Sequence, residues 1–246
     1  MQQSEQTPDT LAELSDDWRT ALVVVAHPDD IEYGLAAAVA RWTGEGRTVT
    51  YLLATHGEAG IDTMDPVEAA SVRAQEERDG ATEVGVDVVE FLDHPDGVVE
   101  YGLTLRRHIA AVIRRRRPDA VFGLTHRERF AGGGTNQADH RAVGSALLDA
   151  ARDAGNRWVF PELGVDDEPW SGVRFVAFAN APEPTHAVDV TGHLDAAVAS
   201  LEAHGRYLDA LGEDYPDPRT LLEGILTGGG RLTGTTHGIG FEVFDL

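Results

Sequence analysis

Two residue types are missing from this chain of 246 residues, cysteine and lysine. Without cysteine the chain can form no disulfide bond, and any metal site must be built without thiolate ligands. Without lysine, all 20 basic residues are arginines, against 42 acidic residues, and the net charge is −22. No apolar run approaches the length of about 20 residues that a transmembrane helix needs, so we expect no membrane insertion.

The excess of acidic residues sets expectations about solvent and partners. At a net charge of −22 the acidic side chains repel one another in dilute salt. Concentrated salt screens this repulsion to a short range, so the charge is tolerated there. We interpret the chain as halophilic and cytoplasmic, because its start also lacks the basic and apolar regions of a signal peptide. The alternative, an acidic protein from a GC-rich genome, explains arginine in place of lysine but not the acidity. The charge also argues against nucleic acid as a partner.

The length of the chain and its apolar fraction of 42% fit one α/β domain. We expect a flexible acidic tail over residues 1–16. A single domain would then cover residues 17–246 and end in a glycine-rich segment. Assembly into a homo-oligomer is compatible with the sequence, which does not decide it.

Strand-like and helix-like segments alternate along the chain. Apolar runs predict strands at 21–26, 48–55, 88–92, 120–125, 158–163 and 173–179. Helical spacing of apolar side chains predicts helices at 29–46, 66–85, 103–118, 139–155 and 194–211. We expect a hairpin or a rim from the glycine-rich stretch 227–244. The alternation is typical of βαβ units and predicts an α/β fold, with a mainly parallel sheet and helices on both faces.

Polar side chains follow the first four predicted strands at the point where each strand ends. His-Pro-Asp-Asp at 27–30 follows the first strand, His56 the second, Asp93 the third and His126 the fourth. In open α/β sheets, ligands bind beyond the carboxyl ends of the strands. We therefore expect the functional site at the C-terminal edge of the sheet.

The residues at this edge favour a metal site. His27 and Asp30 are three residues apart across a turn, and His140 opens a helix that begins at the same edge. Two imidazoles and one carboxylate are a common catalytic zinc set, which leaves a position for water. Asp29 cannot easily share the metal within the same tight turn and is better placed as a general base. The alternative is a loop in which Asp29 or Asp30 caps the next helix and His140 binds nothing.

Several motifs together resemble the LmbE / PIG-L family of zinc-dependent N-acetylglucosamine de-N-acetylases. They are AHPDD at 26–30, ATHGEAG at 54–60, VRAQEERDGATEVGV at 72–86, HPDG at 94–97 and QADHRAVG at 137–144. The resemblance implies a Rossmann-like sheet and a hydrolase that removes the acetyl group from an N-acetylated sugar or sugar conjugate. The implied cofactor is Zn²⁺, with another divalent metal such as Fe²⁺ as an alternative. The implied substrate is a small-molecule amino sugar.

The resemblance also implies roles for single residues. His27, Asp30 and His140 would hold the metal, and Asp29 would be the base that activates water. Two further residues, Arg73 and Asp96, would contact the sugar. For Arg73 a structural alternative stays open, because it could form an ion pair with Glu77, four residues along the same predicted helix.

Two positions depart from the family pattern. A histidine that several relatives carry three residues before His140 is Gln137 here, and a tyrosine two residues earlier is Thr135. Glutamine can donate a hydrogen bond to an oxyanion but cannot act as a general acid. We therefore take Gln137 as a catalytic donor. Either Asp29 carries the proton in both directions, or another histidine, His126 or His237, replaces the acid. Two alternatives stay open, an amidase for a thiol or secondary-metabolite conjugate and a non-catalytic module that binds metal or sugar.

Overall fold

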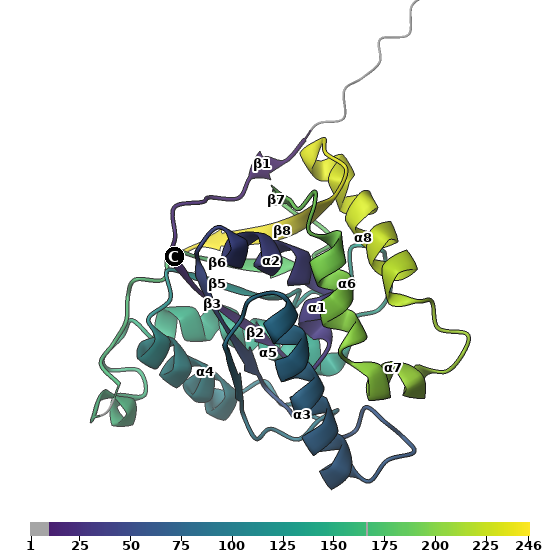
Figure 1. Ribbon diagram of the computed structural model, residues 1–246. Coiled ribbons are helices and arrows are strands. Elements are labelled where there is room, and N and C mark those ends of the chain that lie inside the picture. Colours follow the sequence, from purple (N-terminus) through teal and green to yellow (C-terminus); the bar gives the residue numbers. More distant parts are fainter. Residues whose placement is uncertain (1–9, 166) are drawn as a thin grey trace, which may run out of the picture.

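An eight-stranded sheet runs through the molecule in the order β1-β7-β8-β6-β5-β2-β3-β4 (Figure 1). The computed structural model describes residues 10–165 and 167–246. The strands are β1 (Ala12–Glu13), β2 (Thr20–Val25), β3 (Thr48–Leu53), β4 (Val88–Phe91), β5 (Ala120–Leu124), β6 (Phe175–Ala179), β7 (His186–Asp189) and β8 (Gly238–Asp245). All described pairings are parallel except those of β8 with β6 and β7. The predicted, mainly parallel α/β sheet is thereby confirmed.

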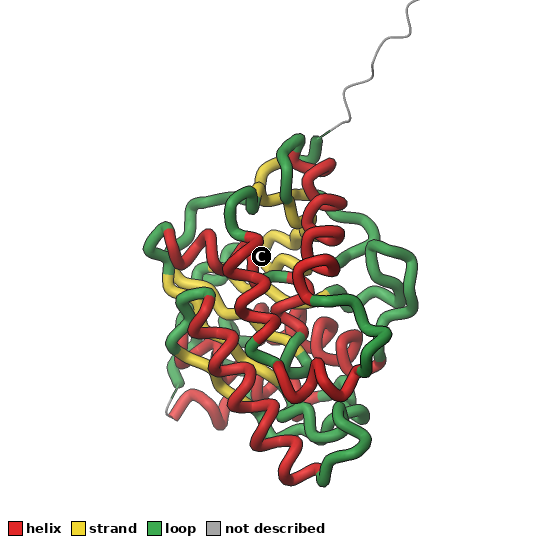
Figure 2. The backbone as a smooth tube through the Cα atoms, turned by 45° about the vertical axis from the view of Figure 1, so that its right-hand side comes forward, coloured by secondary structure: helices red, strands yellow, loops and turns green. Residues whose placement is uncertain are grey.

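Helices cover both faces of this sheet, as two views of the molecule show (Figures 1 and 2). They are α1 (Asp30–Gly34), α2 (Ala36–Gly44), α3 (Pro66–Glu83), α4 (Leu103–Arg116), α5 (Ala138–Asp153), the 3-10 helix η1 (Pro161–Val165), α6 (Leu194–Glu202), α7 (Gly205–Leu211) and α8 (Pro218–Thr233). Among these described helices, none combines the length and the apolar character that crossing a membrane requires.

The central strand β2 shows why the sheet is covered on both sides. Successive side chains of a strand point to opposite faces. Val23 and Val25 pack in one buried cluster with residues of α1, α2 and α6. Leu22 and Val24 pack in the other cluster, with residues of α4 and α5. A continuous apolar run is therefore needed here, because neither face of the strand meets water.

Three predicted segments differ from the structure in their secondary structure. The predicted strand at 158–163 is a turn followed by η1, because Pro161 has no N–H to give to a strand ladder. The predicted helix at 29–46 is divided at Leu35 into α1 and α2, and that at 194–211 is divided at 203–204 into α6 and α7. Apolar spacing continues across both breaks, so periodicity alone does not reveal them.

The glycine-rich stretch 227–244 forms neither a simple hairpin nor a rim. Its first part continues α8 to Thr233, and its last part is β8, which inserts between β6 and β7. The prediction was wrong because it relied on the low helix propensity of glycine. A Cβ atom at Gly229 would collide with the backbone of Gly238, so tertiary packing of α8 on β8 needs glycine there.

The predicted tail and domain boundaries can be compared with the structure only in part. Residues 1–9 of the predicted flexible tail 1–16 lie outside the described residues. From Thr10 the chain is described, and β1 pairs in parallel with β7, while Leu14 is buried. The tail prediction is therefore corrected for residues 12–14. The single domain over 17–246 stays a prediction, with which one continuous sheet agrees.

Candidate active site

The loop after β2 carries three polar residues to the C-terminal edge of the sheet. The Asp30 carboxylate accepts hydrogen bonds from the backbone N–H groups of Ala26 (3.0 Å) and His27 (2.9 Å), which closes a tight turn. Asp29 has a φ of 95°, in the left-handed region that few residues other than glycine adopt. Strained backbone of this kind is found mostly where function requires it. In this turn the two adjacent carboxylates have different partners.

The partner of Asp30 is His140. This contact brings together the three predicted metal ligands His27, Asp30 and His140, here called the trio. Nε2 of His140 lies 3.0 Å from Oδ1 of Asp30 and 3.2 Å from Nδ1 of His27. One atom of each side chain lies within 4.8 Å of the others. His27 and Asp30 are buried, and His140 is half-buried. Two imidazole nitrogens and a carboxylate oxygen at this spacing suit a divalent metal with open coordination positions.

In each of the two histidines, the ring nitrogen that points away from the trio contacts side-chain oxygen atoms. Nε2 of His27 lies 3.0 Å from Oδ1 of Asp96 and 3.2 Å from Oδ2 of Asp139. Nδ1 of His140 lies 3.0 Å from Oδ1 of Asn136, whose amide group donates to the carbonyl of Thr125. Such contacts place the ring protons on the outer nitrogens and orient each ring. The remaining nitrogens, Nδ1 of His27 and Nε2 of His140, face one another at 3.2 Å.

Asp139 and Asn136 were not among the predicted site residues. Asp139 is buried and also accepts hydrogen bonds from the backbone N–H groups of Gly97 (2.7 Å) and Val99 (3.1 Å). It thereby ties α5 to the loop after β4. One signal could have identified Asp139, because it directly precedes His140 at the start of a helix. No comparable signal marks Asn136, which lies within a polar loop.

Burial and neighbouring charges shift the pKa values of this loop in opposite directions. Burial raises the pKa of Asp29 to about 6, against the opposing effect of the Arg73 charge. Burial alone would also raise the pKa of Asp30, but His140 and His27 outweigh it and hold that pKa below its usual range. Burial would lower the pKa of His27, yet Asp139, Asp96 and Asp30 together raise it to about 10. Asp29 therefore has a pKa closer to neutral pH than an ordinary aspartate, which suits a general base.

Helix α3 holds Asp29 in place. Nη2 of Arg73 lies 2.9 Å from Oδ1 of Asp29, and the guanidinium also donates to the carbonyls of Pro28 and Gly57. Oε2 of Glu77 accepts a hydrogen bond of 3.2 Å from the backbone N–H of Asp29. The sequence suggested an ion pair between Arg73 and Glu77, but both residues turn to Asp29 instead. A sugar contact of Arg73 stays a prediction.

Glu77 belongs to a fully buried cluster of three ionisable side chains, with Glu32 and His204. Nε2 of His204 lies 3.6 Å from Oε2 of Glu32 and 3.9 Å from Oε2 of Glu77. Burial would lower the pKa of His204, but the two carboxylates raise it to about 9. Burial and the charge of Glu32 raise the pKa of Glu77 well above its usual range. The cluster joins α1, α3 and the start of α7 beneath the loop.

Two cavities meet at the trio. A cavity of about 410 Å³, here called the polar cavity, is lined by charged and polar side chains that include Asp29, Arg73, Asp96, Gln137 and Tyr207. A second cavity of about 640 Å³, here called the apolar cavity, lies beside α8 and β8. Both cavities are bordered by Asp30, Tyr33 and His140. A substrate bound at the trio could therefore extend in two directions.

The predicted catalytic partners lie in different places. Gln137, which directly precedes α5, is exposed and lines the polar cavity. Within the described chain, neither His126 nor His237 lines either cavity. His126 instead packs against Phe178 and Phe244 on the side of the sheet that α5 covers. The prediction of His126 as the replacement acid is corrected, because the turn after β5 directs its side chain away from the trio.

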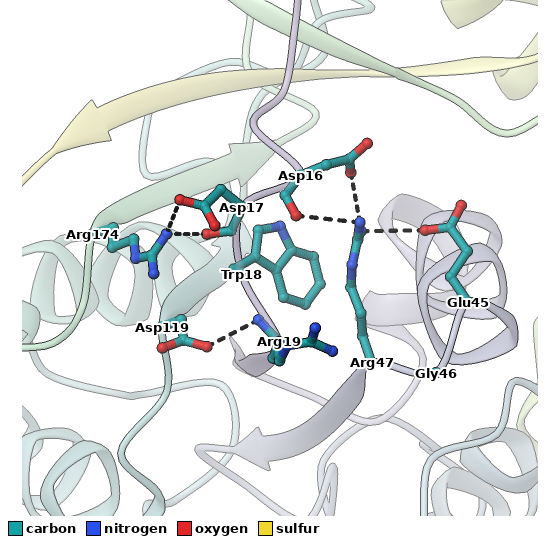
Figure 3. Close-up of a pocket in the computed structure, with 9 residues that line it drawn as sticks. All are labelled: Asp16, Asp17, Trp18, Arg19, Glu45, Gly46, Arg47, Asp119 and Arg174. Carbon is teal, nitrogen blue, oxygen red and sulfur yellow. Dashed lines mark hydrogen bonds and ion pairs between the residues drawn. The ribbon is translucent and has the colours of Figure 1, made fainter.

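A further hollow of about 440 Å³ lies at the opposite edge of the sheet (Figure 3). It is lined by residues just before β2, β3, β5 and β6, at the amino ends of these parallel strands. Its charges pair with one another, Arg47 with Asp16 at 2.9 Å and Arg174 with Asp17, and Arg47 stacks on Trp18. The figure shows Trp18 between these two pairs. The hollow therefore arises where the paired charged side chains pack at the amino ends of the strands.

The chain is similar in sequence to known deacetylases. A model of the GlcNAc-PI de-N-acetylase family, PIG-L, matches residues 22–151, which include the whole trio. The chain is 28% identical over 195 residues to diacetylchitobiose deacetylase of Thermococcus kodakarensis, covering 76% of this chain and 70% of that protein. It is 29% identical over 266 residues to the 1D-myo-inositol 2-acetamido-2-deoxy-alpha-D-glucopyranoside deacetylase of Kineococcus radiotolerans, covering 81% and 72%.

The fold is also that of a solved deacetylase. The structure of N,N'-diacetylchitobiose deacetylase from Pyrococcus horikoshii aligns with a TM-score of 0.82 at 22% identity, covering 93% of this chain and 85% of that chain. A conserved protein from Thermus thermophilus aligns with a TM-score of 0.73 at 26% identity, covering 90% and 92%. The α/β fold predicted from alternating strands and helices is thereby confirmed a second time.

Proposed function

Since the chain belongs to the GlcNAc-PI de-N-acetylase (PIG-L) family of deacetylases, we propose that it is a metal-dependent hydrolase that removes the acetyl group from an N-acetylated sugar or sugar conjugate. The names of two relatives specify such substrates, diacetylchitobiose and an acetamido-deoxy-glucopyranoside of inositol. The observation that carries the proposal is the position of Asp29, a buried carboxylate next to the trio in the wall of a polar cavity.

The residues of the trio fit a metal ion. We propose Zn²⁺, with Fe²⁺ as an alternative, held by Nδ1 of His27, Nε2 of His140 and the Asp30 carboxylate. The support is the oriented outer nitrogens and the low pKa of Asp30, which keeps this carboxylate ionised. When bound, such a metal polarises the amide carbonyl and lowers the pKa of water.

The side chains around the trio supply the remaining steps. Asp29 removes a proton from the attacking water as a C–O bond forms at the amide carbonyl carbon. The side-chain amide of Gln137 donates a hydrogen bond to the developing oxyanion. Asp29 then returns its proton to the amide nitrogen, the C–N bond breaks, and acetate and a free amine leave. Arg73 keeps Asp29 oriented throughout, and Asp96 borders the cavity in which the sugar lies.

The proposed function is tested by acetate release from a panel of N-acetylglucosamine conjugates. The assay runs in molar salt, because an acidic chain of this kind is expected to need charge screening. We expect chelation to reduce release to background and added Zn²⁺ to restore it. If stoichiometric metal is bound and no conjugate is hydrolysed, the removal of acetyl fails, in favour of a different acyl substrate or of a module that only binds.

Asp139→Asn is expected to lower metal affinity by about 10- to 100-fold. Asparagine keeps one oxygen that can accept from the backbone N–H of Val99, but the amide NH₂ in place of Oδ2 can accept neither from the His27 ring nor from the backbone N–H of Gly97. Competition with a chelator measures the affinity. Asp149→Asn, on the same helix but paired with Tyr101, serves as the control and should change nothing. An unchanged affinity in Asp139→Asn would mean that Asp96 alone orients His27.

A further inference from the structure

The apolar cavity has no part in the proposed mechanism, although it opens directly onto the trio. It lies between α8 and the sheet edge, and its volume of about 640 Å³ exceeds the 410 Å³ of the polar cavity. Figure 1 shows α8 beside β8, and residues of both elements line the cavity. The cavity is therefore a candidate for part of the substrate.

The wall of this cavity is unusual for so charged a chain. Although 25% of all residues are charged, the only ionisable residues in its described lining are Asp30, Tyr33 and His140, at the end shared with the polar cavity. Apart from the amide of Asn180, the rest consists of apolar side chains, such as Leu124, Phe130, Ile225, Leu232 and Ile239, and of glycines. Ile225 is 38% exposed there. An apolar cavity with a few polar groups at one end is typical of a ligand-binding site.

Two glycines of α8 keep the cavity open. Glycine inside a helix lowers stability relative to alanine, so each one asks for a reason. Gly229 and Gly230 have one, because a Cβ atom would meet the backbone around Gly238 and Thr235. Gly224 and Gly228 have none, since a Cβ atom at either would meet nothing within 4 Å. Both line the cavity, one helical turn apart, and larger side chains there would fill it.

The position of the trio between the cavities decides which part of the substrate belongs where. An amide carbonyl at the trio has two substituents, the amine and the acyl chain. The polar cavity, with Asp29, Arg73 and Asp96, suits the hydroxyl groups of an amino sugar. The apolar cavity then lies on the acyl side. An acetyl methyl group would leave most of 640 Å³ empty.

We propose that the apolar cavity is an acyl-binding subsite, and that the enzyme hydrolyses N-acyl amino sugars whose aliphatic acyl chain is longer than acetyl. The inference rests on the proposed function, a hydrolase for N-acyl amino sugars at this site, and extends its substrate class from acetyl to longer aliphatic acyl groups. In the reaction, water adds to the carbonyl carbon, the C–N bond breaks, and the amine nitrogen takes the proton. The products are an aliphatic carboxylate and the free amino sugar.

A chain-length series tests the subsite directly. The substrates are N-acetyl-, N-butyryl-, N-hexanoyl- and N-octanoyl-glucosamine with the metal-loaded enzyme, and kcat/KM is measured for each. Burial contributes about fourfold per methylene group, so N-hexanoyl should exceed N-acetyl by at least about tenfold. If acetate is released but kcat/KM is flat or falls with chain length, the subsite is refuted while the proposed function stands.

Variants that fill the cavity sharpen the test. Gly228→Leu, and independently Gly224→Leu, should each lower the ratio of N-hexanoyl to N-acetyl kcat/KM by about tenfold. Thr227→Leu is the matched control, because it adds a similar side chain at an exposed position of α8 outside the cavity lining, and its ratio should equal that of wild type. Thermal unfolding confirms that each variant is folded. A wild-type ratio in both glycine variants would overturn the assignment.

Two further measurements separate the inference from its alternatives. Octyl N-acetylglucosaminide carries the apolar chain on the aglycone, and a gain with this compound but not with N-octanoyl-glucosamine would assign the cavity to the aglycone and refute the acyl subsite. Binding of octanoate by calorimetry does not need turnover. If no N-acyl substrate is hydrolysed, the proposed function fails. Saturable octanoate binding that Gly228→Leu abolishes would still support the subsite, and its absence would refute it.

Discussion

Asp29→Asn is expected to lower kcat by about 10²- to 10⁴-fold, the usual contribution of a general base, while metal content stays at the wild-type level. Asparagine matches aspartate in shape and tolerates the left-handed φ of 95° at this position. Its amide oxygen can still accept from Arg73, so the loop keeps its anchor. What the variant loses is the ability to take a proton from water.

The pH dependence of the wild-type enzyme gives a second readout of the same residue. Burial raises the pKa of Asp29 to about 6. A base works only when unprotonated, so kcat/KM should fall about tenfold per pH unit below that value and level off above it. The residual activity of Asp29→Asn should lack this acidic limb. Asp195→Asn, exposed on α6 and away from both cavities, should behave as wild type.

Wild-type turnover in Asp29→Asn would show that another group activates water. Loss of activity together with loss of metal would point instead to Asp29 as a ligand. Measuring metal content and rate on the same preparation therefore separates the two roles that adjacent carboxylates could exchange.

His140→Ala is expected to abolish turnover by releasing the metal, with an affinity loss greater than the roughly 10- to 100-fold expected for a residue that only orients a ligand. Asp30 and His27 keep their own contacts, to the backbone and to Asp139. His140 is half-buried between the two cavities, so its removal should leave the fold intact. Metal analysis after dialysis and thermal unfolding measure the two effects separately, and added imidazole should restore part of the metal binding.

An alternative trio makes this experiment decisive. His27, Asp96 and Asp139 also offer ligand atoms within 4.8 Å of one another. If a metal occupied that side of the His27 ring, His140→Ala would retain it and Asp139→Asn would lose it. The proposed site requires the reverse order of effects. Stoichiometric metal in His140→Ala would thus move the metal to the other ring nitrogen of His27.

Strands β2 to β6 and the motif at their ends followed from the sequence alone. Val23 and Val25 alternate with Leu22 and Val24 on a strand buried on both faces, and this pattern is visible in any apolar run. Parallel strands end at a common edge, so the residues after β2 and those that open α5 had to come close. His27, Asp30 and His140 were predictable for this reason, and Asp29 through its place beside them.

The partners of these residues were decided by tertiary structure. Arg73 could equally have paired with Glu77 on its own helix, and only the docking of α3 against the loop turns both towards Asp29. His126 follows a strand like the other candidates, yet the turn after β5 directs it under α5. Which way a side chain faces after a strand end depends on one turn, and apolar periodicity does not encode that turn.

The glycines of α8 show the same limit most clearly. Glycine weakens a helix, and no helix was predicted for the stretch with Gly228, Gly229 and Gly230, just after Gly224. The folded chain separates them into two that let α8 approach β8 and two that leave space beside the trio. The sequence specifies only that these four positions lack a side chain. Whether that absence serves close packing or an open cavity depends on which atoms the fold brings opposite each residue.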